Sequence, residues 1–301
     1  PAPIDDLFTQ PMAAGSAVLN GAGELTGSVE IAEWGMLETP VLLTGTIAVG
    51  RCYDAVVSAV FDAVPEAGNG VEDVVIPVVG ECDDSWLDDA RARNVRVEDA
   101  LAALRGATSD APALGAVGAG AGMIAFDCKA GIGSASRRVD ELDATVGVLV
   151  LANFGSIDRL TVDGAPVGRR LAAQGFGRGN SQREPAGSCI VVVATDAPLD
   201  AHGCSRLARR AGLGLARIGS IGHHGSGEIF LAFSTTSRSP RAPRFTEPMT
   251  RPAAGSWIDP LFAGVVEATE EAVLDALCVA NTVEGRDGRV APALPVESLH
   301  R

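Results

Sequence analysis

The order of apolar and polar positions along the chain predicts an alternation of strands and helices. Nearly continuous apolar runs, typical of buried strands, occupy residues 40–46, 74–79 and 144–152, the stretch from 188 onward, and 229–234. Apolar residues at helical spacing predict helices over 50–64, 97–104, from 200 onward, and over 259–280. With no internal repeat and no linker between these elements, the pattern indicates one α/β domain over residues 1–301.

Two further stretches lack such a pattern. The glycine-rich segment 115–122 superficially resembles a phosphate-binding loop. It lacks the Gly-Lys-Ser/Thr ending and no helical pattern follows it, so we exclude nucleotide binding there. Residues 285–301 are predicted to form a loose, mostly polar tail.

The strand that begins at Ser188 follows an unusual junction. Residues 175–185 are polar, charged and glycine-bearing, which predicts an exposed loop, and the sequence then changes at Gly187-Ser188 to GSCIVVVATDAPL. A serine at the first position of a buried strand, after a glycine that leaves its carbonyl open to attack, suggests self-cleavage there. On pattern alone the usual interpretation of Gly-Ser before a strand is a simple turn.

Composition and charge narrow the classes of partner. The formal net charge of −14 argues against nucleic acid or an anionic membrane as the main partner. No apolar run approaches the length of roughly 18 residues that a membrane span needs, so we expect a soluble protein. The six cysteines are scattered without a C-x-x-C pair, and we therefore expect buried thiols and no metal site.

Several segments, in order, resemble the L-aminopeptidase/D-Ala-esterase/amidase and β-peptidyl aminopeptidase family. The resemblance rests on VLNGAGELTG at 18–27, Gly122-Met123 with KAGIGSASR at 129–137, VGVLVLANFG at 146–155, the GSCIVVVATDAPL stretch at 187–199, and GSGEIFLAFST at 225–235. These segments cover essentially the whole chain. The family belongs to the self-processing, N-terminal-nucleophile type of hydrolase.

The resemblance implies a fold and an assembly. The fold is a four-layer α-β-β-α sandwich with Ser188 at the start of a central strand. Cleavage between Gly187 and Ser188 would divide the single domain into segments 1–187 and 188–301, which associate with each other and form a homo-tetramer of cleaved protomers. The chain begins inside the family pattern, so we expect further residues before Pro1 and leave the compartment open between cytoplasm and periplasm.

The resemblance also implies roles for individual residues, without a cofactor. Ser188 is the nucleophile, first for self-cleavage and then toward substrate, with its new α-amine as general base. Asn153 is a side-chain donor of the oxyanion hole. Ser226 and Glu228 tune the serine and its amine.

Two residues are expected to bind substrate. Glu81 would anchor the substrate's amino group, because an aminopeptidase needs an anion to hold a free ammonium. Trp86 is expected either to form a pocket wall or to serve only in packing. Many relatives have an aromatic residue where this chain has Asp83, which changes the expected shape of the pocket.

Taken singly, these residues have ordinary structural interpretations. A strand-end acid such as Glu81 is usually a surface residue, and an isolated Asn at a strand end usually forms a turn. His223-His224 is interpreted as loop histidines rather than a metal or base pair, and for Lys129 we expect a structural ion pair.

Three functions remain open at this point. The leading prediction is a serine aminopeptidase that releases N-terminal residues from short peptides, amides or esters, with β-amino acid peptides included. The second is an acyltransferase like ornithine acetyltransferase, whose threonine nucleophile differs from Ser188. The third is an uncleaved, non-catalytic binding protein.

Overall fold

The computed structural model describes residues 2–70, 74–177, 187–241 and 255–299. Its α-helices are α1 (Ile4–Thr9), α2 (Ser28–Trp34), α3 (Val49–Ala63), α4 (Val97–Arg105), α5 (Val167–Ala173), α6 (Ala201–Arg217) and α7 (Asp259–Cys278). Its strands are β1 (Met12–Gly21), β2 (Met36–Leu37), β3 (Val41–Gly45), β4 (Val78–Cys82), β5 (Ile124–Ala125), β6 (Cys128–Lys129), β7 (Ile132–Val139), β8 (Ala144–Asn153), β9 (Ser188–Thr195), β10 (Gly227–Arg238), β11 (Val283–Glu284) and β12 (Val290–Ala291).

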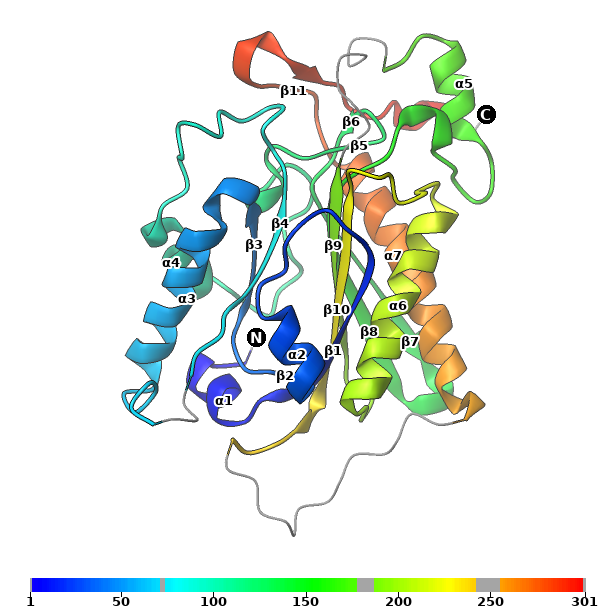
Figure 1. Ribbon diagram of the computed structural model, residues 1–301. Helices are drawn as coiled ribbons and strands as arrows, with labels where there is room; N and C mark the ends of the chain where they lie inside the picture. Colours follow the sequence, from blue (N-terminus) through cyan, green and yellow to red (C-terminus); the bar gives the residue numbers. More distant parts are fainter. Residues whose placement is uncertain (1, 71–73, 178–186, 242–254, 300–301) are drawn as a thin grey trace.

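A large mixed sheet forms the centre of the molecule. Within the described residues it has six strands in the order β2-β1-β10-β9-β8-β7. Strands β9 and β10 run parallel, and every other neighbouring pair is antiparallel. Helices α6 and α7 cover one face of this sheet, as Figure 1 shows. The buried stripe of α6 includes Leu207, Ala208, Ala211 and Leu215, as the helical spacing predicts.

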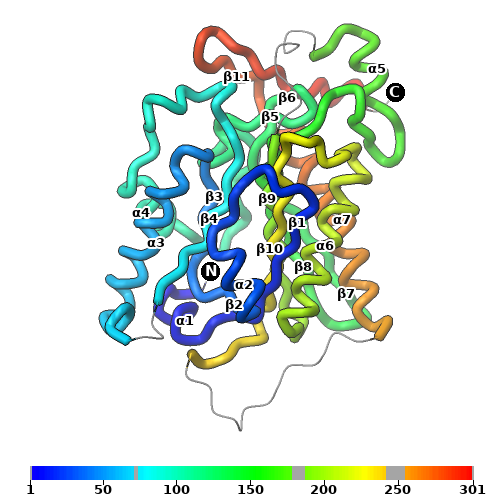
Figure 2. Tube along the Cα trace, in the orientation of Figure 1, coloured from blue at the N-terminus to red at the C-terminus, as the bar shows by residue number. Residues whose placement is uncertain are grey.

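A second, smaller layer covers the other face of the sheet. Strands β3 and β4 pair in parallel, and α3 and α4 pack outside them (Figures 1 and 2). The two sheets approach closely at Gly80, where an added Cβ would lie only 3.0 Å from a methyl carbon of Ile190. Leu151, Ile190 and Ile229 are buried between the sheets. The structure thus has the expected order of helices, sheet, sheet and helices, within a single domain.

At three places the structure differs from what the sequence pattern predicts. The strand expected at 74–79 is instead β4, beginning at Val78, because Pro77 has no N–H to donate to a ladder. Helix α5 follows the turn at Asp163-Gly164 and was not predicted. The tail predicted over 285–301 is not loose throughout, because β12 within it pairs with β11, which lies just before it, as a short hairpin.

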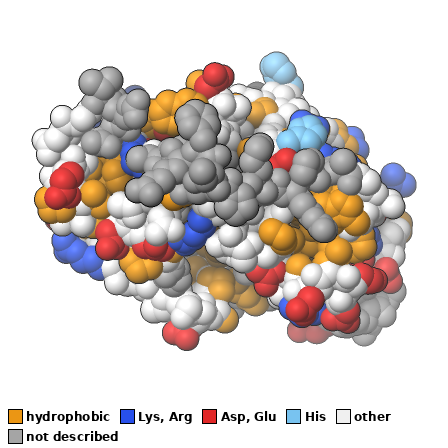
Figure 3. Space-filling view, turned by 90° about the horizontal axis from the view of Figure 1, so that it is seen from below, with side chains coloured by type: hydrophobic (Ala, Val, Ile, Leu, Met, Phe, Trp, Pro, Cys, Tyr) orange, Lys and Arg blue, Asp and Glu red, His pale blue; other side chains and the backbone are white. Residues whose placement is uncertain are grey.

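The distribution of surface charge and the character of the helices both bear on what the molecule contacts. Figure 3 shows that, on the face drawn and among its described residues, basic side chains are spread between acidic and apolar ones. Among the helices of the described ranges, none combines the length and apolar character required to cross a membrane.

Lys129, the only lysine of the 301 residues, is fully buried beneath the glycine-rich segment. Its ammonium donates to the carbonyl oxygens of Gly120 at 2.8 Å, Met123 at 2.9 Å and Ala130 at 2.6 Å. Burial lowers its pKa to about 8, so it is still mostly protonated at neutral pH. The expected ion pair is wrong: three backbone carbonyls take the three N–H bonds of the ammonium.

Replacement of this lysine tests whether the buried ammonium stabilises the fold. Lys129→Met removes three charge-assisted hydrogen bonds from buried carbonyl oxygens, so we expect the free energy of unfolding to fall by roughly 3 kcal/mol. The oxygens of Gly120 and Met123 keep backbone N–H donors, at 3.2 and 3.1 Å, whereas that of Ala130 loses its ammonium donor. Urea denaturation measures this value. Arg51→Met is the control, because Arg51 also donates to two carbonyls, of Arg93 and Val95, but at the surface. It should cost less than about 1 kcal/mol, and equal losses in the two variants would contradict the argument.

Candidate active site

The central strands bring three predicted site segments together at one end of the large sheet, where β8 ends and β9 and β10 begin. Ser188 is the first residue of β9, and it pairs with Asn153, the last residue of β8. On its other side Ser188 pairs with Gly227 at the start of β10, between Ser226 and Glu228. Residues separated by tens of positions in the sequence therefore meet at one place, because the hydrogen-bond register of the sheet aligns them.

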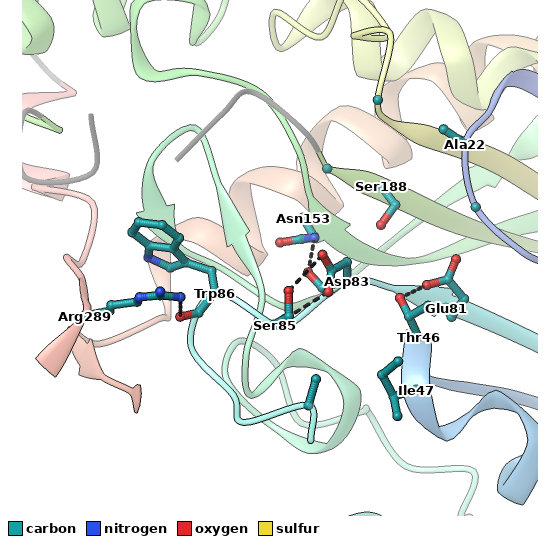
Figure 4. A pocket seen from close by; sticks show the side chains of 14 residues that line it. Ala22, Thr46, Ile47, Glu81, Asp83, Ser85, Trp86, Asn153, Ser188 and Arg289 are labelled. Carbon is teal, nitrogen blue, oxygen red and sulfur yellow. Dashed lines mark hydrogen bonds between the residues drawn. The ribbon is translucent and has the colours of Figure 1, made fainter. Parts of the chain in front are cut away.

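A pocket of about 630 Å³ opens at this end of the large sheet, between it and the smaller sheet. It is lined by Ala22, Gly23, Thr46, Ile47, Glu81, Asp83, Ser85, Trp86, Ala90, Asn153, Gly187, Ser188, Gly225 and Arg289. In Figure 4, Thr46 and Glu81 lie on one side of the pocket and Trp86 and Arg289 on the other, with Ser188 and Asn153 between them. Of the predicted site residues, Ser226 and Glu228 are not in this lining.

The side chain of Asn153 is held in one orientation by two hydrogen bonds. Its Oδ1 accepts from the backbone N–H of Ile124 at 2.9 Å, and its Nδ2 donates to the carbonyl oxygen of Asp83 at 2.8 Å. Since Oδ1 accepts from an N–H, the amide cannot be reversed without losing both bonds. The Nδ2 group carries a second N–H, which leaves one donor for an anionic oxygen in the pocket.

Glu81 reaches the pocket from β4, in the smaller sheet, and is almost fully buried. One carboxylate oxygen accepts from the backbone N–H of Glu24 at 2.8 Å, and the other accepts from the hydroxyl of Thr46. Burial raises the pKa of Glu81, and Asp83 and the Glu24 carboxylate add to the rise, while the two hydrogen bonds oppose it. The carboxylate is thus fixed in position but has no cation beside it among the described residues, which suits it to receive an ammonium group.

The buried hydroxyl of Ser188 lies beside the thiol of Cys82 and has no other hydrogen-bond partner among the described residues. The nearby thiol of Cys82 is fully buried, which raises its pKa, although the Ser188 hydroxyl partly lowers it. Burial also raises the pKa of the Cys189 thiol well above its usual value. Both cysteines are therefore neutral thiols at physiological pH.

Ser226 and Glu228 form a pair on either side of Gly227, the partner of Ser188, and neither belongs to the pocket lining. The hydroxyl of Ser226 donates to one carboxylate oxygen of Glu228, whose other oxygen is buried without a partner among the described residues. Burial raises the pKa of Glu228, and the bond from Ser226 opposes the rise. Side chains alternate along a strand, so Glu228 shares the helix-covered face with Cys189, whereas Ser188 shares the inter-sheet face with Ile190.

The turn before this pair is held by Asn20, whose structural role the sequence did not reveal. Its Nδ2 lies 2.8 Å from the carbonyl oxygen of His223, 3.2 Å from that of His224 and 2.5 Å from that of Ser226. The two histidines lie in a loop, as predicted, and contribute backbone carbonyls here. The described residues contain no group of three or more His, Cys, Asp or Glu side chains that could hold a metal ion.

Gly187 is required by the packing of the junction itself. An added Cβ would lie 2.1 Å from the carbonyl oxygen of Asn153 and 2.8 Å from the Cα of Phe154, so no other residue fits without moving β8. The carbonyl oxygen of Gly187 accepts from the backbone N–H of Gly227 at 3.1 Å. Residues 178–185 of the loop predicted before this junction lie outside the described residues.

Two pocket residues were missed by sequence reasoning. Thr46 orients Glu81, and Arg289 stacks on Trp86, with its guanidinium carbon 4.5 Å from the centre of the indole ring. Trp86 does line the pocket, which favours the wall over the purely structural interpretation. No motif marks Thr46 or Arg289, since each is brought to the pocket by the tertiary fold.

The orientation of Asn153 gives a prediction that does not depend on activity. Asn153→Ala removes the buried hydrogen bonds to the N–H of Ile124 and to the carbonyl of Asp83, so we expect the free energy of unfolding to fall by about 2 kcal/mol. Asn69→Ala is the control, because Asn69 makes a single exposed bond to Pro65, and it should change stability by less than about 0.5 kcal/mol. Equal urea midpoints for the two variants would refute the bracing role of Asn153.

Comparison with known proteins agrees with this site. Residues 2–291 match the model of peptidase family S58. The β-peptidyl aminopeptidase BapA of Sphingosinicella microcystinivorans is 39% identical over 303 residues, which cover 96% of this chain and 75% of that protein. The expected enzyme class, an aminopeptidase, is thereby confirmed.

Solved structures show the same fold. The β-aminopeptidase of a Burkholderia species superposes with a TM-score of 0.86 at 38% identity, covering 98% of this chain and 81% of that one. The L-aminopeptidase D-Ala-esterase/amidase of Ochrobactrum anthropi, described as a serine aminopeptidase with a variant of the Ntn hydrolase fold, superposes with a TM-score of 0.87 at 34% identity, covering 96% and 80%. The family expected from the sequence is confirmed, and the chain belongs to peptidase family S58.

Proposed function

We propose that this aminopeptidase cleaves itself between Gly187 and Ser188 and then uses Ser188 to release N-terminal residues from short peptides, amides or esters. We include β-aminoacyl peptides among the substrates, since two similar proteins are named for β-peptides or β-amino acids. The observation that carries the proposal is the Ser188 hydroxyl at the start of β9, in a pocket that also presents Asn153 and Glu81.

In the first stage the Ser188 Oγ attacks the carbonyl carbon of Gly187. The peptide C–N bond breaks, the nitrogen of Ser188 leaves as an amine, and the resulting ester is hydrolysed by water. The bond from Gly227 to the Gly187 oxygen supports this step, because a donor already lies on the oxygen that becomes negatively charged. The products are segments 1–187 and 188–301.

The topology of the sheet would keep the two segments together. Strands β9 and β10 come from segment 188–301, and they lie between β1 and β8, which come from segment 1–187. Each of these central strands has hydrogen bonds to the other segment along most of its length. The large core beneath α6 and α7 also draws on both segments. Separation would expose that core and break two strand ladders.

In the second stage the free α-amine of Ser188 acts as general base toward its own hydroxyl. Such an amine has a typical pKa of about 7.7–8.0, close to neutral pH. Ser226 and Glu228, on the helix-covered face of the sheet, would hold and polarise this amine. Asn153 would donate its remaining N–H to the oxyanion, and Glu81 would bind the ammonium of the substrate.

The assembly of cleaved protomers into a homo-tetramer stays a prediction. It is supported by apolar side chains that one protomer leaves exposed on neighbouring segments, among them Val18, Leu19 and Ile221. A Cβ added at Gly212 of α6 would lie 3.6 Å from Leu19, and one added at Gly222 would lie 3.8 Å from it, so these segments lie next to one another.

Intact mass spectrometry tests self-cleavage directly. We expect two fragments from the wild-type protein, with the break between Gly187 and Ser188, and one uncut chain from Ser188→Ala. Ser58→Ala, on α3 in the outer layer, is the matched control and should cleave as the wild type does. An uncut wild-type chain without amidase activity would overturn the mechanism and favour the non-catalytic binding protein. Preferred transfer of the acyl group to an added amine, rather than to water, would favour the acyltransferase.

The role of Glu81 is tested by substrates that carry a free amine. Glu81→Gln removes the negative charge, and a charge-assisted hydrogen bond contributes roughly 1.5–3 kcal/mol, so we expect kcat/KM to fall about ten- to a hundredfold, mainly through KM. Glu24→Gln is the control, because the contact of Glu24 with Glu81 uses its backbone N–H and its side chain is exposed. Equal kinetics for Glu81→Gln and wild type would remove Glu81 from substrate binding.

A further inference from the structure

The pocket carries a cation at the side opposite Glu81. Arg289 lines the pocket and, among the described lining residues, it is the only lysine or arginine. It lies beside Trp86, whereas Glu81 and Thr46 lie across the pocket, with Ser188 and Asn153 between the two sides (Figure 4). In a chain of net charge −14, whose pocket also contains Asp83, an arginine at this place needs an explanation.

The guanidinium of Arg289 is held by Trp86. One terminal nitrogen donates to the carbonyl oxygen of Trp86 at 3.1 Å, and the group stacks on the indole ring. Its carboxylate neighbour Asp287 is mostly exposed, and the nearest distance between the two groups is 3.9 Å, so water screens this pair. A guanidinium has five N–H donors, and several remain for an anion in the pocket.

The backbone that carries Arg289 is fastened to the same loop. The N–H of Arg286 donates to the carbonyl oxygen of Leu87 at 2.8 Å, and the N–H of Gly285 donates to the carbonyl oxygen of Arg289 at 2.8 Å. An added Cβ on Gly285 would lie 2.4 Å from the Leu87 oxygen, so the two segments touch along their backbones. The arginine is therefore positioned by the fold, rather than placed on a free surface tail.

We propose that Arg289 binds the α-carboxylate of the leaving residue and so makes free dipeptides the preferred substrates. The inference rests on the proposed function. A dipeptide bound with its ammonium at Glu81 and its scissile carbonyl at Ser188 and Asn153 directs its leaving residue toward Trp86 and Arg289. Arginine suits a carboxylate because its planar fork of donors matches the two oxygens.

The test compares β-alanyl-L-alanine with β-alanyl-L-alaninamide, which differ only in the carboxylate. We expect the wild-type enzyme to prefer the free acid. Arg289→Gln should lower kcat/KM for the acid at least tenfold, through KM, and change the value for the amide less than twofold. Arg289→Lys should restore part of the preference. Arg286→Gln, in the same turn but paired with Asp287, is the control and should keep the wild-type preference.

Other outcomes would overturn the inference. Equal loss on both substrates in Arg289→Gln would show that Arg289 only supports Trp86. Unchanged kinetics on both would show that no carboxylate binds there. Cleavage into two chains, measured in each variant, shows that the protein has folded. If the wild type cleaves neither substrate, the proposed function fails, and this inference fails with it.

Discussion

The site depends on the position of β9 between β8 and β10, because the pairing of these strands places Asn153 and Gly227 beside Ser188. Ser188 is opposite Asn153 on one side and Gly227 on the other, and the side-chain alternation points Ser188 into the space between the sheets. A slip of one residue would turn Ser188 toward the helices and bring Cys189 into the pocket. The apolar residues that follow prevent such a slip, since Ile190 and Val191 fill two different cores.

Two carboxylates, those of Glu81 and Glu228, are buried on opposite faces of the large sheet near the start of β9. Neither has a cation beside it among the described residues. Burial raises the pKa of both Glu81 and Glu228. A buried acid without a cationic partner costs stability. In the proposed mechanism each receives an ammonium or amine group, Glu81 from the substrate and Glu228 from the new chain terminus. The unfavourable electrostatics of the uncleaved chain would thus be relieved by the chemistry that the site performs.

Much of the fold and part of the site could be predicted from the sequence. The strand beginning at Ser188 and the buried stripe of α6 follow from apolar spacing, which is a local property of the chain. The roles expected for Glu81 and Asn153 came from the family resemblance, and the structure brings both to the pocket.

Other features could not be predicted, because they depend on contacts between distant segments. Thr46 meets Glu81 across the β3–β4 pair, and Arg289 meets Trp86 from a short hairpin near the end of the chain. Nothing next to either residue in the sequence marks its partner. Lys129 shows the same limit, since a lone lysine predicts a carboxylate partner, whereas the fold surrounds this one with three carbonyls.

The burial of that lysine has a consequence for the reactivity of the native protein. These 301 residues contain no other lysine, and Lys129 is fully covered and hydrogen-bonded. Within these residues, reagents directed at primary amines will therefore find no accessible lysine side chain on the folded molecule. In the proposed mechanism, cleavage adds one amine, the α-amine of Ser188, so acylating agents or aldehydes would distinguish the cleaved chain from the uncleaved one.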